Sequence, residues 1–115
     1  MEWSRVFQFS MENALEMMLI FDIQGEILYA NPAAENLLKY KNTVCGNQII
    51  EVFPNLEEIK RWYQTEEETR EIHSLMAYRG NRTCFPVKAK IIFCPWKYQE
   101  RQVYLCVASD ISAEN

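Results

Sequence analysis

The sequence of 115 residues contains little of what catalytic and metal sites need. Histidine occurs once, as His73, so a site with several histidine ligands is impossible, and the alternation around this residue is typical of a strand position. With only three glycines, the sequence has no phosphate-binding loop, dinucleotide-binding fingerprint or nucleophile elbow. We therefore expect no catalytic residues, no metal site and no enzymatic activity within this chain.

The sequence also lacks a long apolar run. No stretch approaches the roughly 20 apolar residues that cross a bilayer, and the N-terminus, MEWSRVFQFSMEN, has neither the basic start nor the apolar block of a signal peptide. The four cysteines show no Cys-x-x-Cys spacing, so we expect small apolar residues rather than disulfide partners. These features predict a cytoplasmic protein without a membrane segment.

Basic residues are scattered and outnumbered by acidic ones. There are 12 lysines and arginines against 16 aspartates and glutamates, a net charge of −4. A phosphate-binding surface needs clustered lysine and arginine, so a nucleic-acid partner is disfavoured. Hydrophobic residues make up 49% of the chain, which is enough for the core of one domain.

One block near the N-terminus combines a hairpin and a capped helix. The apolar run Met17 to Phe21 predicts a strand, Asp22 to Gly25 supplies turn residues, and Glu26 to Ala30 predicts a second strand beside the first. Asn31 then offers a side-chain oxygen to the free N–H groups of a helix. Pro32 suits the first helical position, where the N–H is unpaired anyway. A β-hairpin followed directly by a helix is therefore expected.

The remaining elements follow from the same signals. Short helical turns are predicted for Asn47 to Phe53 and a longer helix for Asn55 to Glu66. Period-two patterns predict strands at Thr69 to Tyr78 and Thr83 to Phe93, joined by a turn whose Gly-Asn pair is expected at positive φ. Val103 to Ser109 predicts a closing strand that is apolar on both faces, so other elements must cover each of its two faces. The order predicts an α+β fold with a five-stranded antiparallel sheet and short helices on one face.

The first sixteen residues form a flanking segment with an apolar stripe. Trp3, Phe7 and Met11 recur at helical spacing, so a helix is predicted from about Ser4 to Glu16. The stripe either packs on its own domain or forms a contact between two subunits, because it is large for a helix at the edge of a small fold. The sequence leaves both alternatives open.

Two segments together resemble the PAS sensor domain. The first is D-x-x-G-x-I-x-Y-x-N, from Asp22 to Asn31, followed by the proline-initiated helix. The second is the final strand with its ending Asp110-Ile111-Ser112, where the family has Asp-Ile-Thr. The resemblance implies a flanking helix over 1–16, a PAS domain over 17–112 and the start of a linker over 113–115. It also implies that the first strand lies between the second and the last.

The resemblance allows the cofactor classes of the family to be compared with this sequence. Haem-binding members supply a histidine from the helix before the third strand, and the matching stretch, Asn55 to Glu66, has none. Flavin-binding members with a light-reactive cysteine carry G-x-N-C-R-F-L-Q, whereas the matching stretch from Gly46 has Ile49 at the cysteine position. Haem by that route and a covalent flavin adduct are thus disfavoured. The cofactor stays unknown, with non-covalent flavin still open.

A cavity between helices and sheet is the expected place for any ligand of such a fold. A filled core is the favoured interpretation, since cavities in small domains seldom stay empty. A small apolar ligand is the alternative. The candidate lining residues are Ile20, Ile49, Phe53, Tyr63, Val87, Ala89 and Leu105.

The resemblance also implies a role for the C-terminal motif. In the family, the matching residues tie the last strand to the helix that carries the signal out, so Asp110 and Ser112 are the candidates here. The resulting hypothesis is a homodimeric sensory module of a bacterial signalling protein, with Trp3, Phe7 and Met11 at the dimer interface. It would regulate a histidine kinase or diguanylate cyclase in the same polypeptide. The rival hypotheses are a pure protein-interaction module and, less favoured because the inward positions are apolar, a small enzyme.

Overall fold

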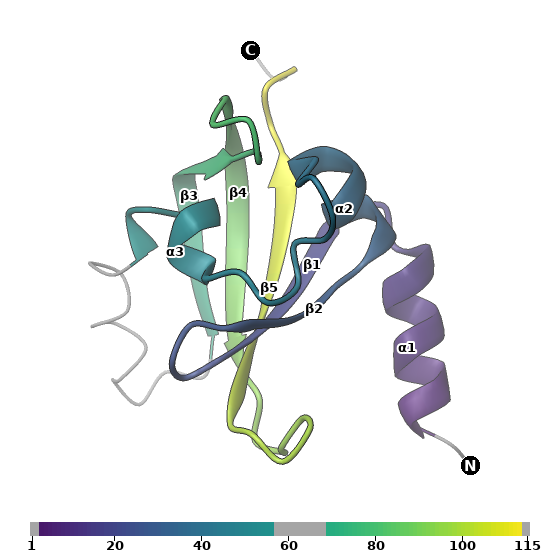
Figure 1. Cartoon of the computed structure of the whole chain (residues 1–115). Coiled ribbons are helices and arrows are strands. Elements are labelled where there is room, and N and C mark those ends of the chain that lie inside the picture. The colour runs from purple at the N-terminus through teal and green to yellow at the C-terminus, as the bar shows by residue number, and fades with distance from the viewer. Residues whose placement is uncertain (1–2, 57–68, 114–115) are drawn as a thin grey trace.

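The computed structural model describes residues 3–56 and 69–113, and side chains at 5–56 and 75–113. Within these ranges the chain forms an α+β domain (Figure 1). The elements follow in the order α1 (Trp3–Asn13), β1 (Met17–Asp22), β2 (Ile27–Ala30), α2 (Pro32–Leu38), α3 (Ile49–Val52), β3 (Thr69–Tyr78), β4 (Cys84–Phe93) and β5 (Val103–Asp110). Most of the helix expected from Asn55 to Glu66 lies outside the described residues.

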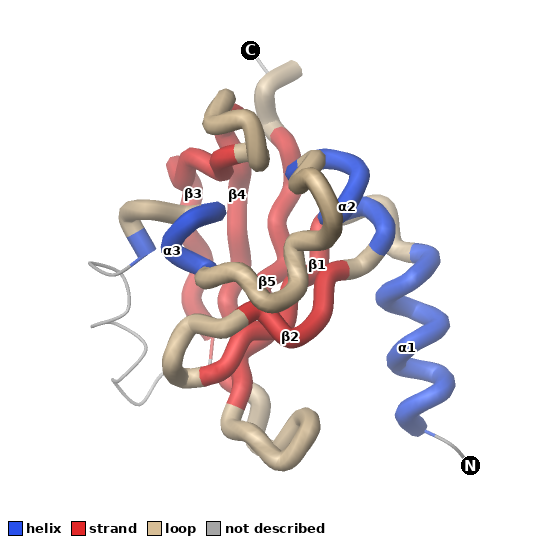
Figure 2. The backbone as a smooth tube through the Cα atoms, in the orientation of Figure 1, coloured by secondary structure: helices blue, strands red, loops and turns tan. Residues whose placement is uncertain are grey.

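The strands form a five-stranded antiparallel sheet in the order β2-β1-β5-β4-β3 (Figure 2). The first strand therefore lies between the second and the last, as predicted. Strands β1 and β5 come from opposite ends of the sequence, and the whole of β1 pairs with β5, from Met17 opposite Ala108 to Asp22 opposite Val103. The sheet centre is thus built from the residues nearest the two ends of the domain.

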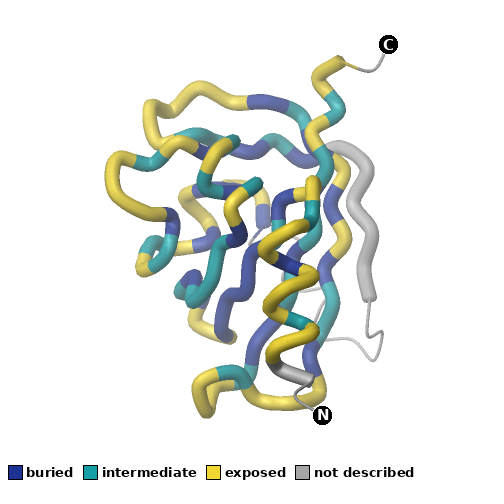
Figure 3. The backbone as a smooth tube through the Cα atoms, turned by 90° about the vertical axis from the view of Figure 1, so that its right-hand side faces the viewer, coloured by how far each residue is buried: buried dark blue, intermediate teal, exposed yellow. Residues whose placement is uncertain are grey.

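Helices cover both faces of this sheet. Helices α2 and α3 lie on the inner face, where their buried side chains join those of all five strands in the larger hydrophobic cluster. Helix α1 lies on the outer face, over a smaller cluster that includes Ile20 and Val103. Figure 3 looks onto α1, whose side chains are mostly exposed, with buried strand positions behind it. The closing strand is therefore buried on its inner face, whereas on its outer face Val103 is buried and Leu105 and Val107 stay half-buried.

Strand β4 shows the alternation that the sequence predicts. Val87 and Ala89 are buried on the inner face, and Lys88 and Lys90, which follow them in turn, are exposed on the outer face. Successive side chains of a strand point to opposite faces, so one side faces the core and the other faces water.

Helix α1 ends at Asn13, three residues earlier than predicted. In a continuing helix the carbonyl of Met11 would accept from the N–H of residue 15. Here that carbonyl accepts from Ala14 N (3.3 Å) and from the side-chain amide of Asn31 (2.9 Å). Leu15, which the apolar periodicity placed on the helix, is 94% exposed. A long-range hydrogen bond therefore stops the helix before its sequence pattern ends.

The turn between β3 and β4 differs from the prediction. Positive φ falls on Arg82 (68°), not on the Gly-Asn pair, and Arg82 N donates to Arg79 O (2.9 Å) in a three-residue loop. Gly80 is needed for a different reason: its N–H donates to Leu38 O (2.8 Å), and a Cβ there would come within 2.9 Å of Lys39 O. The glycine thus permits close contact with the end of α2.

The connector between β4 and β5 contains a strained two-residue turn. Gln99 and Glu100 both have positive φ, 50° and 63°, and Tyr98 and Arg101 exchange both backbone hydrogen bonds around them. This is the geometry of a type I′ turn, which Asn-Gly favours and longer side chains oppose.

Replacing the pair Gln99-Glu100 by Asn-Gly is expected to stabilise the domain by about 1 kcal/mol, because the left-handed strain is relieved. Urea denaturation of both proteins measures the effect. A matched Gln99→Ala, Glu100→Ala variant keeps the positive φ at two residues with a Cβ and should show no such gain. Equal stability of all three proteins would contradict the assignment of strain to this turn.

Candidate functional site

Four of the predicted pocket residues meet on the inner face of the sheet. Ile49 and Phe53 come from α3 and its end, and Val87 and Ala89 come from β4. All four are at most 2% exposed and belong to the larger cluster. Tyr63, the fifth candidate, lies outside the described residues. The sequence pattern therefore placed these four side chains together, under the helices.

Ile20 and Leu105 do not join them, which corrects the predicted pocket. The two residues are paired across β1 and β5 and pack in the smaller cluster, on the outer face beneath α1. Their strand neighbours Leu19 and Cys106 take the inner face instead. Successive side chains of a strand point to opposite faces, so an error of one residue in assigning the inward positions moves a residue to the opposite face. Both strands are apolar on both sides, so their residue pattern does not indicate which side chains face the core.

Aromatic rings fill one end of the inner face. Tyr104 stacks on Phe21 with ring centroids 5.4 Å apart and meets Phe93 edge-on at 5.6 Å. Burial raises the pKa of Tyr104, so the ring carries a neutral hydroxyl at physiological pH. These three side chains bring large apolar surfaces together where β1, β5 and β4 run side by side.

Asn31 joins α1, β1 and α2 through its side chain. The residue is fully buried, and its carbonyl oxygen accepts from Ala34 N (3.0 Å), as predicted for a helix cap, and from Met18 N (2.9 Å). Its amide nitrogen donates to Met11 O and Glu16 O, each at 2.9 Å. The cap could be predicted from its neighbour Pro32, but the two donor bonds join positions 15 and 20 residues away and left no local signal.

The entry of the chain into β1 lies beside its exit from β5. Met17 pairs with Ala108, and the Ser109 hydroxyl donates to the Glu16 carboxylate. The same Glu16 offers its backbone carbonyl to Asn31. A short path of hydrogen bonds therefore runs from the end of α1, through residue 16, to the end of the last strand.

The predicted output residues form a turn at this exit. Asp110 Oδ1 accepts from Ser112 N (2.9 Å) and from the Ser112 hydroxyl (2.6 Å), and these bonds hold the pKa of Asp110 below its usual value. Ile111 N donates to Pro86 O (3.0 Å), which fastens the exit to β4. The turn fixes the direction in which the chain leaves the sheet, while a role of Asp110 and Ser112 in signal output stays a prediction.

An ion pair joins the β4–β5 connector to the turn between β1 and β2. Asp22 is buried; one carboxylate oxygen accepts from Gln24 N and Glu26 N at 2.9 Å, and the other meets Arg101 Nη1 at 3.0 Å. The Arg101 guanidinium also lies 3.3 Å from the Glu26 carboxylate. The aspartate that the sequence assigned to a turn therefore also holds a segment nearly eighty residues further along the chain.

The proposed dimer residues lie differently from the expectation. Met11 is buried and Phe7 half-buried against their own sheet, and the Trp3 side chain lies outside the described residues. The outward side of α1 instead presents Val6 and Phe9, the latter 69% exposed. Of the two alternatives for the apolar stripe, Phe7 and Met11 therefore follow the first: they pack on their own domain.

The cysteines differ in burial and therefore in expected reactivity. Burial raises the pKa of Cys106 to about 12 and also raises that of Cys94, whereas Cys84 is exposed. At pH 8 the Cys106 thiolate fraction is on the order of 10⁻⁴. We expect Ellman's reagent to modify Cys84 first and to reach Cys94 and Cys106 only after unfolding. A Cys84→Ser variant should lose the fast phase; a fast phase that persists would contradict this order.

The described residues contain no group of three or more His, Cys, Asp or Glu side chains arranged to hold a metal ion. Nor is any helix among them both long and apolar enough to span a bilayer.

Sequence and structure comparisons agree on one family. The sequence model of the PAS domain matches residues 15–113. No curated protein matches the sequence significantly.

Solved PAS domains have the same fold at low sequence identity. The PAS domain of a Colwellia psychrerythraea protein superposes with a TM-score of 0.81 at 13% identity, covering 96% of this chain and 98% of that one. The PAS domain of an HTR-like protein from Haloarcula marismortui gives 0.75 at 20% identity, with 96% and 98% covered. A PAS domain from a two-component sensor histidine kinase gives 0.70 at 16% identity, with 93% and 97% covered.

Proposed function

This chain belongs to the PAS domain family, and from that premise we propose that it is the signal-sensing module of a cytoplasmic signalling protein. The module acts as a homodimer and regulates an effector that follows it in the same polypeptide. One of the similar solved domains comes from a two-component sensor histidine kinase, which favours a kinase as the effector over a diguanylate cyclase.

The observation that carries this proposal is the link between chain entry and chain exit. Asn31 binds the end of α1, and Glu16, one of its partners, binds Ser109 beside the output turn. A movement of α1 therefore changes hydrogen bonds at the end of the central strand pair where the chain enters β1 and leaves β5. Such a link is what a module needs to pass a change at its flanking helix to a following domain.

The proposed mechanism is a shift between two packings of α1. The helix is held at its C-terminal end by Asn31, and Phe7 and Met11 rest on the outer face of the sheet. A stimulus that binds one packing more tightly than the other shifts their populations, since an equal affinity for both would change nothing. The shift reaches the exit through Glu16 and Ser109.

A second candidate is a protein-interaction module that senses no small molecule. It is favoured by the tight burial of the inner face, where Ile49, Phe53 and Val87 are at most 2% exposed. In this case the signal is the arrival of a partner protein, and the same link from α1 to the exit carries it.

A native mass spectrum of freshly purified protein, compared with its denatured mass, tests the proposal. A dimer with extra mass supports a ligand-sensing module and identifies the class of ligand. A dimer without extra mass favours the interaction module. A monomer at all concentrations would overturn the dimeric role. Phe9→Asp, on the outward side of α1, should dissociate the dimer, whereas Ile50→Asp, exposed on α3, serves as the matched control.

A further inference from the structure

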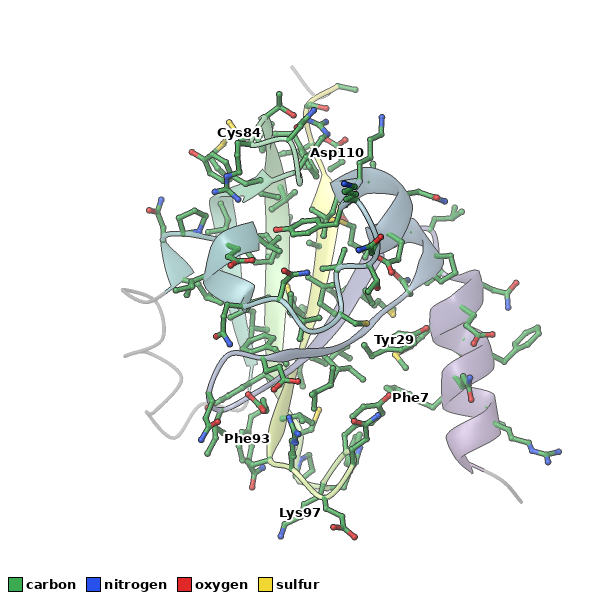
Figure 4. The ribbon with its side chains drawn as sticks, in the orientation of Figure 1. Phe7, Tyr29, Cys84, Phe93, Lys97 and Asp110 are labelled. Carbon is green, nitrogen blue, oxygen red and sulfur yellow. The ribbon has the colours of Figure 1, made fainter. Side chains whose placement is uncertain are left out.

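A groove on the outer face of the domain carries a further inference. It lies between α1 and the β4–β5 connector and has a volume of about 650 Å³. The residues that line it include Phe7, Met11, Tyr29, Trp96 and Tyr98. Figure 4 shows Phe7 on the side of α1 that faces the connector, and Tyr29 between β2 and that helix. The groove is therefore separate from the inner-face core where a pocket was predicted.

The chemistry of the lining is mainly aromatic and apolar. Four of its side chains carry aromatic rings, and Met11 adds a flexible thioether that adapts to flat surfaces. Of the described residues that line the groove, Lys97 alone has a formal charge, and Figure 4 shows it at the far end of the connector. A flat, uncharged aromatic molecule fits this lining better than an ion does.

Tyr29 adds a specific polar group. Its hydroxyl oxygen is buried, and no hydrogen-bond partner for it exists among the described residues. Burial, with the Glu12 charge as a smaller cause, raises the pKa of Tyr29, so the hydroxyl keeps its proton and is a free donor. Because this oxygen has almost no accessible surface, a ligand reaches it only after the Tyr29 ring turns toward the groove. An acceptor atom on the ligand would then recover the free energy that a buried donor without a partner costs.

The size of the groove separates a small molecule from a protein partner. Its volume lies within the range of about 300–1,000 Å³ that small-molecule sites occupy. A standard protein interface buries roughly 800 Å² and uses roughly 20–30 residues on each partner, whereas seven of the described residues line this groove. The two walls of the groove are held in place separately. Asn31 binds the backbone of Met11 on α1, and the Arg101–Asp22 ion pair holds the connector.

We propose that this groove binds a small, flat, uncharged aromatic molecule that offers a hydrogen-bond acceptor to the Tyr29 hydroxyl. The rings pack between Phe7 on α1 and Trp96 and Tyr98 on the connector. The binding site goes beyond the proposed function, because it needs neither a dimer nor an effector. Occupancy would nevertheless press on α1, the helix that the signalling mechanism moves.

Quinoline is a suitable probe, since it is a neutral bicyclic ring with one nitrogen acceptor. Titration followed by amide and indole NMR signals of the purified chain should show saturable shifts at Phe7, Met11, Trp96 and Tyr98. Trp96→Ala, at a residue 58% exposed in the connector, should weaken binding about tenfold without loss of folding. Tyr29→Phe should lower the affinity for quinoline about fivefold. The affinity for free indole, a similar ring system without the nitrogen acceptor, should stay unchanged.

Arg5→Ala is the matched control, because Arg5 lies on the same helix as Phe7, is exposed and does not line the groove. It should leave the quinoline affinity unchanged. Shifts that never saturate, that gather on Ile49 and Phe53, or that are unaffected by Trp96→Ala would overturn the proposal. If dilution of the protein alone moved the same signals, a second copy of the chain would occupy the groove, and the proposal would also fail. These outcomes are independent of the native mass spectrum, so failure of one proposal leaves the other standing.

Discussion

Replacing Asn31 by leucine is expected to lower the free energy of unfolding by about 3 to 5 kcal/mol. The change removes a helix cap, worth about 1 kcal/mol, and leaves two partly buried backbone groups without partners, at about 1–2 kcal/mol each. The two groups are the N–H of Met18 and the carbonyl of Glu16, while the Met11 carbonyl keeps its bond from Ala14 N. A loss of this size approaches the whole stability of a small domain. Urea denaturation followed by circular dichroism measures it.

Asn36→Ala is the control, because this asparagine lies on the same helix and is exposed. It should change stability by less than about 0.5 kcal/mol. Asn31→Asp separates the two roles of the side chain: it keeps an oxygen for Met18 N and Ala34 N but sets a carboxylate against two carbonyls. A loss below 1 kcal/mol for the leucine variant would show that Asn31 does not hold the three elements together.

Phe53→Ala is expected to cost about 3 to 5 kcal/mol as well. Phe53 is fully buried at the end of α3 and belongs to the inner-face cluster, so truncation leaves a cavity among side chains that cannot fully collapse. Thermal or urea unfolding gives the value, and the partly exposed Ile50 of the same helix provides the control, with Ile50→Ala near 1 kcal/mol or less.

The Phe53 experiment also separates the two proposed functions. If the inner face is filled, the full cavity cost appears. A cost below about 1 kcal/mol would mean that space already exists beside Phe53, and the ligand-sensing proposal would then gain a site on the inner face.

Local signals made most of the fold predictable. The turn residues from Asp22 to Gly25 and the Asn31-Pro32 pair lie next to the elements that they end or begin, so β1, β2 and α2 could be placed within about two residues. Strand β3 and nearly all of β4 followed from alternation. The family match over 15–113 and the sheet order confirm the PAS interpretation and the α+β fold.

Features that depend on distant contacts could not be predicted in the same way. Ile20 and Leu105 lie in strands that are apolar on both faces, so nothing in their sequence fixed which face they occupy. The early end of α1 comes from an asparagine twenty residues away, and Gly80 is required by the backbone of Lys39. In each case the deciding partner is remote in the sequence, where residue patterns carry no information.

The central claim is that α1 and the exit of β5 are coupled through Asn31, Glu16 and Ser109. Hydrogen–deuterium exchange of the Asn31→Asp variant tests it most directly. We expect faster exchange both in α1 and at residues 107–112, while the exchange of the β3–β4 hairpin stays as in the unsubstituted chain. Faster exchange confined to α1, with the exit unchanged, would contradict the coupling and with it the proposed route of the signal.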